Sequence, residues 1–235
     1  MIYVMSDTHG DLSRFRAPAV RRLRRSDTLI VLGDFGFVWD DSPAERRALK
    51  WLGRRRYQLL FLDGSHENFD RLAAYPQVEY AGAQAWQLGP RLYRLQRGAV
   101  YTIEKHTLLA FGGGESLDRE ARQEGITWWP QELPGPEDYA RCDASLAACQ
   151  NRVDFILTHD GPTRLLRFLK LNRDSVLYEE NALELYLDGL MKNVSYQKWC
   201  FGRYHLDQQL GPTASAVYRG PLPLWTNWKK GRQRR

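Results

Sequence analysis

Short polar motifs directly follow the short apolar runs of this chain, and this arrangement constrains its fold more than any other feature. Four of the five histidines in the 235 residues lie in these motifs. In layered α/β folds ligands bind at the carboxyl ends of the strands, so the motif side chains are expected to share one rim. Imidazole and carboxylate groups on one rim are what a divalent-metal site needs. The motifs are Asp7-Thr8-His9, Gly33-Asp34, Gly64-Ser65-His66-Glu67, Thr158-His159 and Gly202-Arg203-Tyr204-His205.

Apolar runs alternate with amphipathic segments along the chain, which is typical of a layered α/β fold. The runs predict strands at Ile2–Met5, Thr28–Leu32, Gln58–Leu62, Val100–Ile103, Thr107–Phe111, Phe155–Leu157, Trp199–Phe201 and Ala214–Tyr218. The amphipathic segments predict helices near Asp11–Arg24, Pro43–Arg54, Asn68–Tyr75, Pro136–Cys149, Pro162–Leu169 and Tyr178–Met191. Residues 77–111 are expected to form consecutive strands with antiparallel pairing. The stretch from Gly112 to Pro136 is rich in Gly, Pro and Trp, which predicts a long irregular loop.

No repeat, low-complexity segment or linker divides the chain, so residues 1–228 are expected to form one domain. Residues 229–235 are basic and are expected to be a disordered tail. The net charge of +6 comes mostly from arginine runs. These runs fit either solvated helix faces or an affinity for polyanions such as nucleic acid. No RNA- or DNA-binding motif accompanies them.

Three features predict a cytoplasmic location. The chain opens on a strand-like segment instead of a secretory signal. No apolar run approaches the roughly 18–20 residues that span a bilayer, so no membrane association is expected. Cys142, Cys149 and Cys200 form neither a CxxC pair nor an even framework, which fits a reducing compartment. The sequence leaves the oligomeric state open.

The spacing of Asp7 and His9 brings both side chains to one cation. Residues i and i+2 of an extended chain point to the same side, roughly 6.5 Å apart. Asp7 could equally cap the helix that begins near Asp11, and Asp34 could be another helix or turn cap.

Each remaining histidine motif follows its own apolar strand. A single histidine in this position is more often a hydrogen-bonded structural residue. Five strands that each end in a carboxylate or an imidazole favour a shared site instead. His106 lies in a predicted hairpin turn and is expected to be an exposed bystander.

The order DxH, GD, GNH(D/E), H and GHxH is typical of the calcineurin-like phosphoesterases, and the sequence resembles that family from Asp7 to His205. The resemblance implies two facing mixed β-sheets flanked by helices, an α/β sandwich. Five segments are similar to a bacterial and phage-type branch: Met1–Asp11, Val31–Asp40, Asp63–Asp70, Gly112–Pro134 and Trp199–Asp207.

The resemblance also implies two sets of metal ligands, of which only one is complete. At the second site Ser65 offers a neutral hydroxyl, and Arg203 has no lone pair for a metal. The second ion is therefore expected to bind weakly or not at all. The first ion would take Asp7, His9, Asp34 and His205, and the second Asp34, Ser65, His159 and Arg203.

Arg203 is expected to replace the missing ion electrostatically, because a guanidinium is a good phosphate clamp. A phosphate would then meet a formal charge of about +1, which is the sum over one divalent ion, Arg203 and the two ligand aspartates. Asp160 and Glu115 are candidate carboxylates for repairing the second site, and exposed loop acids are their alternative.

His66 is implied to donate a proton to the leaving oxygen, oriented by Glu67 or by Asp34. It could instead be a structural histidine that caps a helix from Glu67. Trp128 and Trp129 could line the pocket or pack in the core.

The resemblance implies a metal-dependent phosphoesterase that hydrolyses a phosphomonoester or phosphodiester through a metal-activated water. Asp34, His66 and Arg203 would be catalytic, and Ser65 and Arg203 would contact the substrate. Manganese is the expected metal, although iron, zinc, nickel and magnesium also suit mixed His/Asp ligands. Two alternatives remain: a non-catalytic relative that binds a phosphorylated ligand or a partner protein, and a nucleic-acid processing enzyme.

Overall fold

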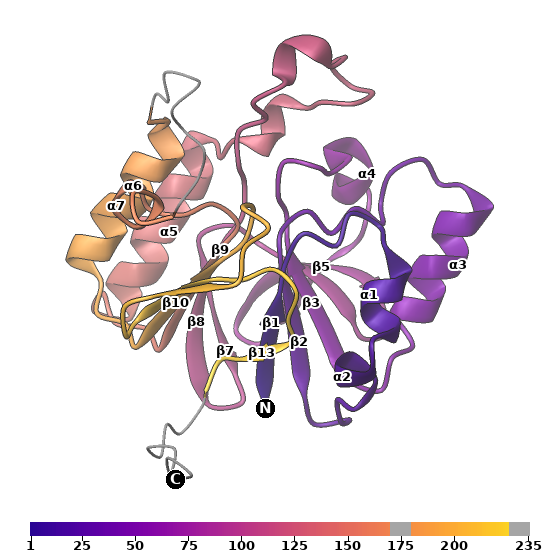
Figure 1. Cartoon of the computed structure of the whole chain (residues 1–235), viewed down its shortest axis with the longest axis horizontal. Coiled ribbons are helices and arrows are strands. Elements are labelled where there is room, and N and C mark those ends of the chain that lie inside the picture. Colours follow the sequence, from indigo (N-terminus) through magenta and orange to yellow (C-terminus); the bar gives the residue numbers. More distant parts are fainter. Residues whose placement is uncertain (170–179, 226–235) are drawn as a thin grey trace, which may run out of the picture.

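Strand β2 (Thr28–Leu32) faces two different hydrophobic cores, and this explains the layered architecture. All five of its residues are buried, and successive side chains of a strand point to opposite faces. Ile30 and Leu32 enter a core between two sheets, whereas Leu29 and Val31 enter a core beneath helices. The computed structural model describes residues 1–169 and 180–225, and these form two facing sheets with helices on both outer faces (Figure 1).

The first sheet has seven strands in the order β13-β1-β2-β3-β6-β5-β4, and the second has six in the order β11-β12-β10-β9-β8-β7. Besides β2, the first sheet holds β1 (Ile2–Met5), β3 (Gln58–Leu62), β4 (Gln77–Tyr80), β5 (Ala83–Gly89), β6 (Leu92–Leu95) and β13 (Leu222–Pro223). The second holds β7 (Ala99–Ile103), β8 (His106–Phe111), β9 (Phe155–Thr158), β10 (Lys198–Phe201), β11 (Gln208–Leu210) and β12 (Ala214–Ala216).

Helices cover the outer face of each sheet, as Figure 1 shows. Buried residues of α1, α2 and α3 pack on β1, β2 and β3, and those of α5, α6 and α7 pack on β8, β9 and β10. The expected sandwich of two facing mixed sheets flanked by helices is thereby confirmed. The helices are α1 (Leu12–Arg16), α2 (Pro18–Arg21), α3 (Pro43–Leu52), α4 (Phe69–Ala73), α5 (Pro136–Ala148), α6 (Thr163–Leu166) and α7 (Ala182–Asn193).

The predicted helix over Asp11–Arg24 is wrong as a single element. Two short helices occupy the segment, and Ala17 between them is extended (φ −54°, ψ 141°). The cause is Pro18, because a proline disfavours the helical conformation at the residue before it. The other predicted helices are confirmed with shifted ends. Residues 178–179 of the last one lie outside the described residues, and α7 begins after the N-cap Asn181.

The middle of the chain forms the expected consecutive strands. The pairs β4–β5, β5–β6 and β7–β8 are antiparallel. Strand β6 also pairs with β3 in parallel, and the chain changes sheet between β6 and β7, which the sequence did not predict. The predicted tail at 229–235 and the domain boundary at residue 228 lie outside the described residues.

The expected irregular loop follows β8. We call residues 112–135 the flap; it contains two short 3-10 helices, Arg119–Ala121 and Pro130–Glu132, and an isolated β-bridge between Glu124 and Trp128. In Figure 1 it projects above the sheets beside α4. No helix within residues 1–169 and 180–225 is long and apolar enough to cross a membrane.

Asp63, at the end of β3, anchors the flap through a buried ion-pair network. Its carboxylate accepts hydrogen bonds from Arg97 Nε at 2.6 Å and Arg94 Nε at 3.3 Å, and its carbonyl accepts one from the amide of Gly113 at 2.9 Å. Arg97 also donates to the carbonyl of Gln131 at 2.8 Å. Both ends of the flap are therefore tied to the strand that precedes His66.

We expect the substitution Asp63→Asn to lower the free energy of unfolding by about 3 kcal/mol or more, because it removes the buried counter-charge that Arg94 and Arg97 share. Urea unfolding at neutral pH measures the loss. Asp41→Asn is the control: Asp41 is 49% exposed and pairs with Arg46 and Arg71, so its loss should stay below about 1 kcal/mol. Equal losses in the two variants would contradict the prediction.

The contribution of Asp63 to the free energy of unfolding should also depend on pH. Burial works to raise the pKa of Asp63, but the guanidinium groups of Arg97 and Arg94 outweigh it and hold the pKa below its ordinary value. The associated stability is therefore present above about pH 4 and is lost as the pH falls through the folded-state pKa. The difference in unfolding free energy between wild type and Asp63→Asn should shrink below about pH 4.

Candidate metal centre

The turns that follow the strands hold their side chains through left-handed backbone conformations. For residues other than glycine such a conformation costs roughly 1–2 kcal/mol, although Asp and His are enriched among its users. Cross-strand hydrogen bonds keep the turns in place, from the amide of Asp7 to the carbonyl of Gly33 at 3.1 Å and from that of His9 to the carbonyl of Asp34 at 2.9 Å. The residues with positive φ at the rim are Asp7 (52°), His9 (44°), Asp34 (48°), Arg203 (69°) and His205 (51°).

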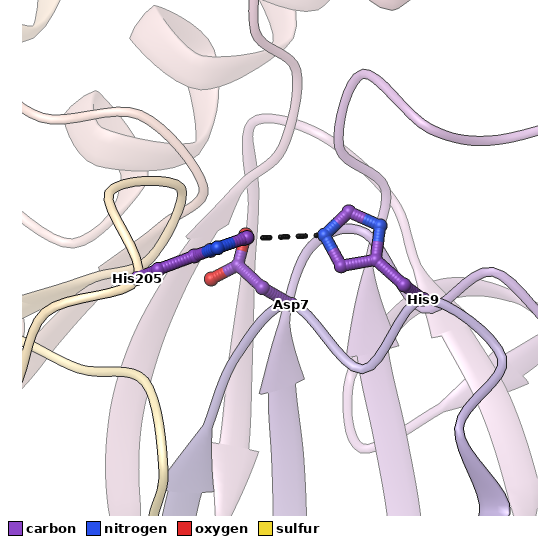
Figure 2. A group of neighbouring side chains, drawn as sticks. All are labelled: Asp7, His9 and His205. Atoms are coloured by element: carbon purple, nitrogen blue, oxygen red, sulfur yellow. Dashed lines mark hydrogen bonds and ion pairs between the residues drawn. The ribbon is translucent and has the colours of Figure 1, made fainter.

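Four predicted ligands of the first ion converge. The Nε2 atoms of His9 and His205 lie 3.2 Å apart and face each other (Figure 2). His9 Nε2 is 3.7 Å from Asp34 Oδ2, and His205 Nε2 is 3.7 Å from Asp7 Oδ1. Two atoms that each lie about 2.1 Å from one tetrahedral ion would be about 3.4 Å apart. The spacing therefore suits a single ion held by Asp7, His9 and His205, with Asp34 beside His9.

The ring of His205 is held from behind by Tyr218. The two rings stack with centroids 4.7 Å apart and an interplanar angle of 13°. The guanidinium of Arg14 lies over the ring of Tyr218, 4.7 Å from its centroid. It also donates a hydrogen bond to the Tyr218 carbonyl at 2.6 Å. Arg14 also donates to the carbonyl of Asp7 at 3.2 Å, so one arginine positions the segments of two ligands.

His159 reaches the same rim from the second sheet. Its buried ring places Nδ1 at 2.8 Å from the carbonyl of Leu32. That carbonyl can only accept, so Nδ1 carries a proton and donates it, and Nε2 is the nitrogen that faces Asp34. Nε2 lies 3.4 Å from Asp34 Oδ1, and ligand atoms of Asp7, Asp34 and His159 all fall within 4.8 Å of one another.

The space beside His159 fits a cation. Asp7 Oδ1 and His159 Nε2 are buried and have no hydrogen-bond partner within the part of the chain that the structure describes. A Cβ atom at Gly64 would overlap Asp34 Oδ1 and lie 2.8 Å from His159 Nε2, so glycine leaves this space open. Carboxylate oxygens and neutral imidazoles are ligands for several divalent metals.

The Asp34 carboxyl group is ionised, which favours cation binding there. Burial works to raise its pKa, but the field of His159 and the hydrogen bonds of His66 outweigh it, so the pKa lies well below its ordinary value. Burial lowers the pKa of His9, which keeps its lone pair available. Burial, with repulsion from Asp34, raises the pKa of Asp7.

Arg203 does not face the rim freely, because Asp160 neutralises it. Its Nε lies 3.3 Å from Asp160 Oδ2, and its Nη2 donates to the carbonyl of Glu115. Burial works to lower the pKa of Arg203, but Asp160 outweighs it and the pKa is raised. Tyr204 donates its hydroxyl proton to the other oxygen of Asp160. Asp160 is fully buried, so the interpretation as an exposed loop acid is wrong for this residue.

Ser65 and His66 occupy the edge of the rim. His66 Nδ1 lies 3.5 Å from Asp34 Oδ2, and the His66 amide donates to Asp34 Oδ1 at 2.8 Å. Glu67 instead accepts from the amide of Phe35 at 2.7 Å, so Asp34 orients His66. The helix-cap alternative for His66 is wrong, since α4 begins after the N-cap Asn68. The Ser65 hydroxyl lies 3.5 Å from His66 Nδ1.

Arg122, a flap residue that belongs to none of the sequence motifs, places its Nη2 2.9 Å from His66 Nε2. Its only local signal is the i,i+4 spacing to Asp118, with which it pairs at 2.8 Å. Trp129 packs in the core and donates to Asp70 at 2.8 Å. The half-buried Trp128 lies under Arg119.

His106 is half-buried, not exposed, because its ring packs between Phe155 and Trp225. It begins β8, whereas His159 and the other motif residues follow the carboxyl ends of their strands. His106 is therefore outside the candidate metal centre.

Comparison with known proteins supports the resemblance seen in the motifs. Residues 1–207 match the family model described as calcineurin-like phosphoesterase. Among solved structures, a phosphopantetheinyl hydrolase from Mycobacterium tuberculosis is similar over 92% of this chain and 89% of its own, with 16% identity and a TM-score of 0.41. No curated protein sequence gives a significant match.

We expect manganese chloride to raise the melting temperature of chelator-treated protein, because a ligand that binds only the native state stabilises it by about 2.7 kcal/mol at a hundred times its Kd. His205→Ala should lose most of this gain. His106→Ala, which removes the histidine outside the rim, should retain it. Thermal scans over a manganese titration provide the measurement, and equal gains in both variants would argue against this centre.

Proposed function

Because the chain belongs to the calcineurin-like phosphoesterase family, we propose that it hydrolyses a phosphomonoester or phosphodiester with one tightly held divalent ion. The observation that carries the proposal is the convergence of ligand atoms from Asp7, His9 and His205, with Asp34 Oδ2 3.7 Å from His9 Nε2. Manganese is our proposed metal, and the mixed His/Asp set also suits iron, zinc, nickel or magnesium. A cytoplasmic location remains a prediction from composition.

The chemistry divides between the ion and the side chains around it. A divalent ion supplies Lewis acidity, which activates a water molecule and polarises a phosphoryl oxygen. Asp34 stays ionised at the centre of the rim. His66 directs Nδ1 toward Asp34 Oδ2 at 3.5 Å, which leaves Nε2 to deliver a proton to the leaving oxygen.

Arg203 is our proposed phosphate clamp in place of the second ion. Its Nη1 is buried and has no hydrogen-bond partner among residues 1–169 and 180–225. A Cβ at Gly114 would lie 3.1 Å from His159 Cδ2 and overlap Nη1, so this N–H group lies beside His159. A buried donor without a partner favours an anionic oxygen.

Asp160 changes the charge that a phosphate would meet. The formal charge of about +1 expected from the sequence left Asp160 out; its carboxylate reduces that charge to about zero for one bound ion. Long-range attraction therefore contributes less than individual donors do. The proposal accordingly assigns substrate binding to directed hydrogen bonds.

Two arginines of the 54–56 run are held in packing contacts, so they give the nucleic-acid alternative little support. Arg55 lies 3.6 Å over the ring of Trp51, and Arg56 Nε donates to the carbonyl of Leu23 at 2.5 Å. These contacts stabilise the helix-packed surface of the first sheet. A non-catalytic relative remains the main alternative, since Ser65 and Arg203 replace two expected ligands.

We expect the manganese-loaded protein to hydrolyse generic aryl phosphate esters. Asp34→Ala should abolish turnover, because it removes a carboxylate that faces both His9 and His159. His66→Ala should reduce kcat by roughly 100-fold or more, as loss of a general acid does. Steady-state kinetics with mono- and diesters provide the measurement. No turnover by wild type across a broad panel would favour the non-catalytic alternative.

Metal analysis after purification with excess manganese should find one tightly held ion per chain. The double substitution Ser65→Asn with Arg203→His should lower activity, because Asp160 loses its partner and the phosphate loses its clamp. Two tightly held ions in wild type would contradict the single-ion proposal. A variant that gained both a second ion and a higher rate would show that the second site is merely eroded.

A further inference from the structure

The flap places a guanidinium against the atom of His66 that faces the leaving group. Arg122 Nη2 lies 2.9 Å from His66 Nε2. His66 Nδ1 faces Asp34, so Nε2 is the nitrogen that accepts this N–H group and faces the flap. An N–H group of Arg122 thus occupies the position where a substrate oxygen must approach His66.

Arg122 is held in place by its own segment. Its Nε pairs with Asp118 Oδ1 at 2.8 Å, and its Nη1 donates to the carbonyl of Thr127 at 3.3 Å. The side chain of Asp118 is 61% exposed, so water screens much of its charge. The guanidinium therefore keeps an effective positive charge while its direction is fixed.

The flap itself is firmly attached to the domain. Buried Glu132 accepts hydrogen bonds from the amide and hydroxyl of Ser116 at 2.8 and 2.6 Å. Trp129 reaches Asp70 at the start of α4, directly after the segment that carries His66. The contact between Arg122 and His66 is thus supported from both sides.

The position of Arg122 has a chemical consequence for the leaving group. A group that protonates the leaving oxygen lies within hydrogen-bond distance of it. A guanidinium less than 3 Å from that group is next to the same oxygen and its immediate substituents. Guanidinium groups bind phosphate oxygens through paired, charge-assisted hydrogen bonds.

We propose that Arg122 binds an anionic oxygen of the leaving group, so that the site favours a phosphoanhydride, such as the terminal phosphate of a nucleoside diphosphate, over esters with a neutral leaving group. This inference rests on the proposed phosphoesterase function. Water attacks the terminal phosphorus and releases one proton to the solvent, and the bond to the bridging oxygen breaks. Protonated His66 gives that oxygen a proton from Nε2, which Arg122 vacates as it turns to the substrate. The products are inorganic phosphate and a nucleoside monophosphate, whose phosphate Arg122 holds.

The test compares ADP with AMP, which share the adenosine and a terminal phosphate and differ in the charge of the leaving group. We expect wild type with manganese to have the higher kcat/KM for ADP. Arg122→Ala should lower the ratio of kcat/KM for ADP to that for AMP by roughly 10- to 100-fold, the range for a hydrogen bond to a charged group. Arg122→Lys should restore part of the ratio, because it keeps the charge.

Two controls separate binding from a structural role. Arg119→Ala removes the neighbouring flap arginine, which lies over Trp128, and should leave the ratio unchanged. Calorimetry with methylenediphosphonate, which is not hydrolysed, should give a Kd weakened by a similar factor in Arg122→Ala. Thermal unfolding reports whether the flap variants remain folded.

The outcomes distinguish this inference from the function on which it rests. Equal losses for ADP and AMP in Arg122→Ala would overturn the inference and leave Arg122 as a positioning residue for His66. Turnover of aryl phosphate without a preference for ADP would also overturn it, while the proposed function stood. No hydrolysis of any of these substrates by wild type would overturn both.

Discussion

The buried carboxylate of Asp34 sets a condition that the rest of the rim has to meet. A charge removed from water is costly unless donors or cations surround it. Here the His66 amide donates to Oδ1, and the rings of His9, His66 and His159 all face the two oxygens. Both sheets contribute to this environment, since His159 follows β9 and the other residues follow β1, β2 and β3. A cation at the rim would complete a set of partners that the fold has already assembled.

The rim side chains converge because the turns that carry them adopt left-handed backbone conformations, which are unfavourable in an isolated turn. Left-handed aspartates and histidines follow β1, β2 and β10, each at a cost that neighbouring hydrogen bonds must offset. Several such bonds connect the two sheets: Arg203 donates its amide proton to Asp7 Oδ2 at 3.0 Å, and His159 Nδ1 donates to the carbonyl of Leu32 at 2.8 Å. The sandwich therefore stabilises the rim, and the rim in turn fixes how the sheets meet.

Most of the fold, and the gathering of the motif side chains at one rim, could be predicted from sequence because both depend on local patterns. Apolar runs defined the buried strands, and each motif directly followed one. Partners distant in sequence were harder to foresee. Asp160 next to His159 gave no sign that it pairs with Arg203, and Arg122 meets His66 only because the flap folds back over α4. The break at Pro18 was a local signal, which the amphipathic pattern of the segment outweighed.

The pairing of Arg203 with Asp160 explains how the rim tolerates a buried arginine. The guanidinium of Arg203 is a fixed positive charge beside His159. Unpaired, that buried charge would destabilise the fold; Asp160 and the carbonyl of Glu115 satisfy two of its nitrogens. The third nitrogen, Nη1, remains without a partner among the described residues. Arg203 paired in this way adds little net charge to the rim and leaves one directed donor. Under the proposed function, such a donor would select a substrate by the placement of its oxygens more than by net charge.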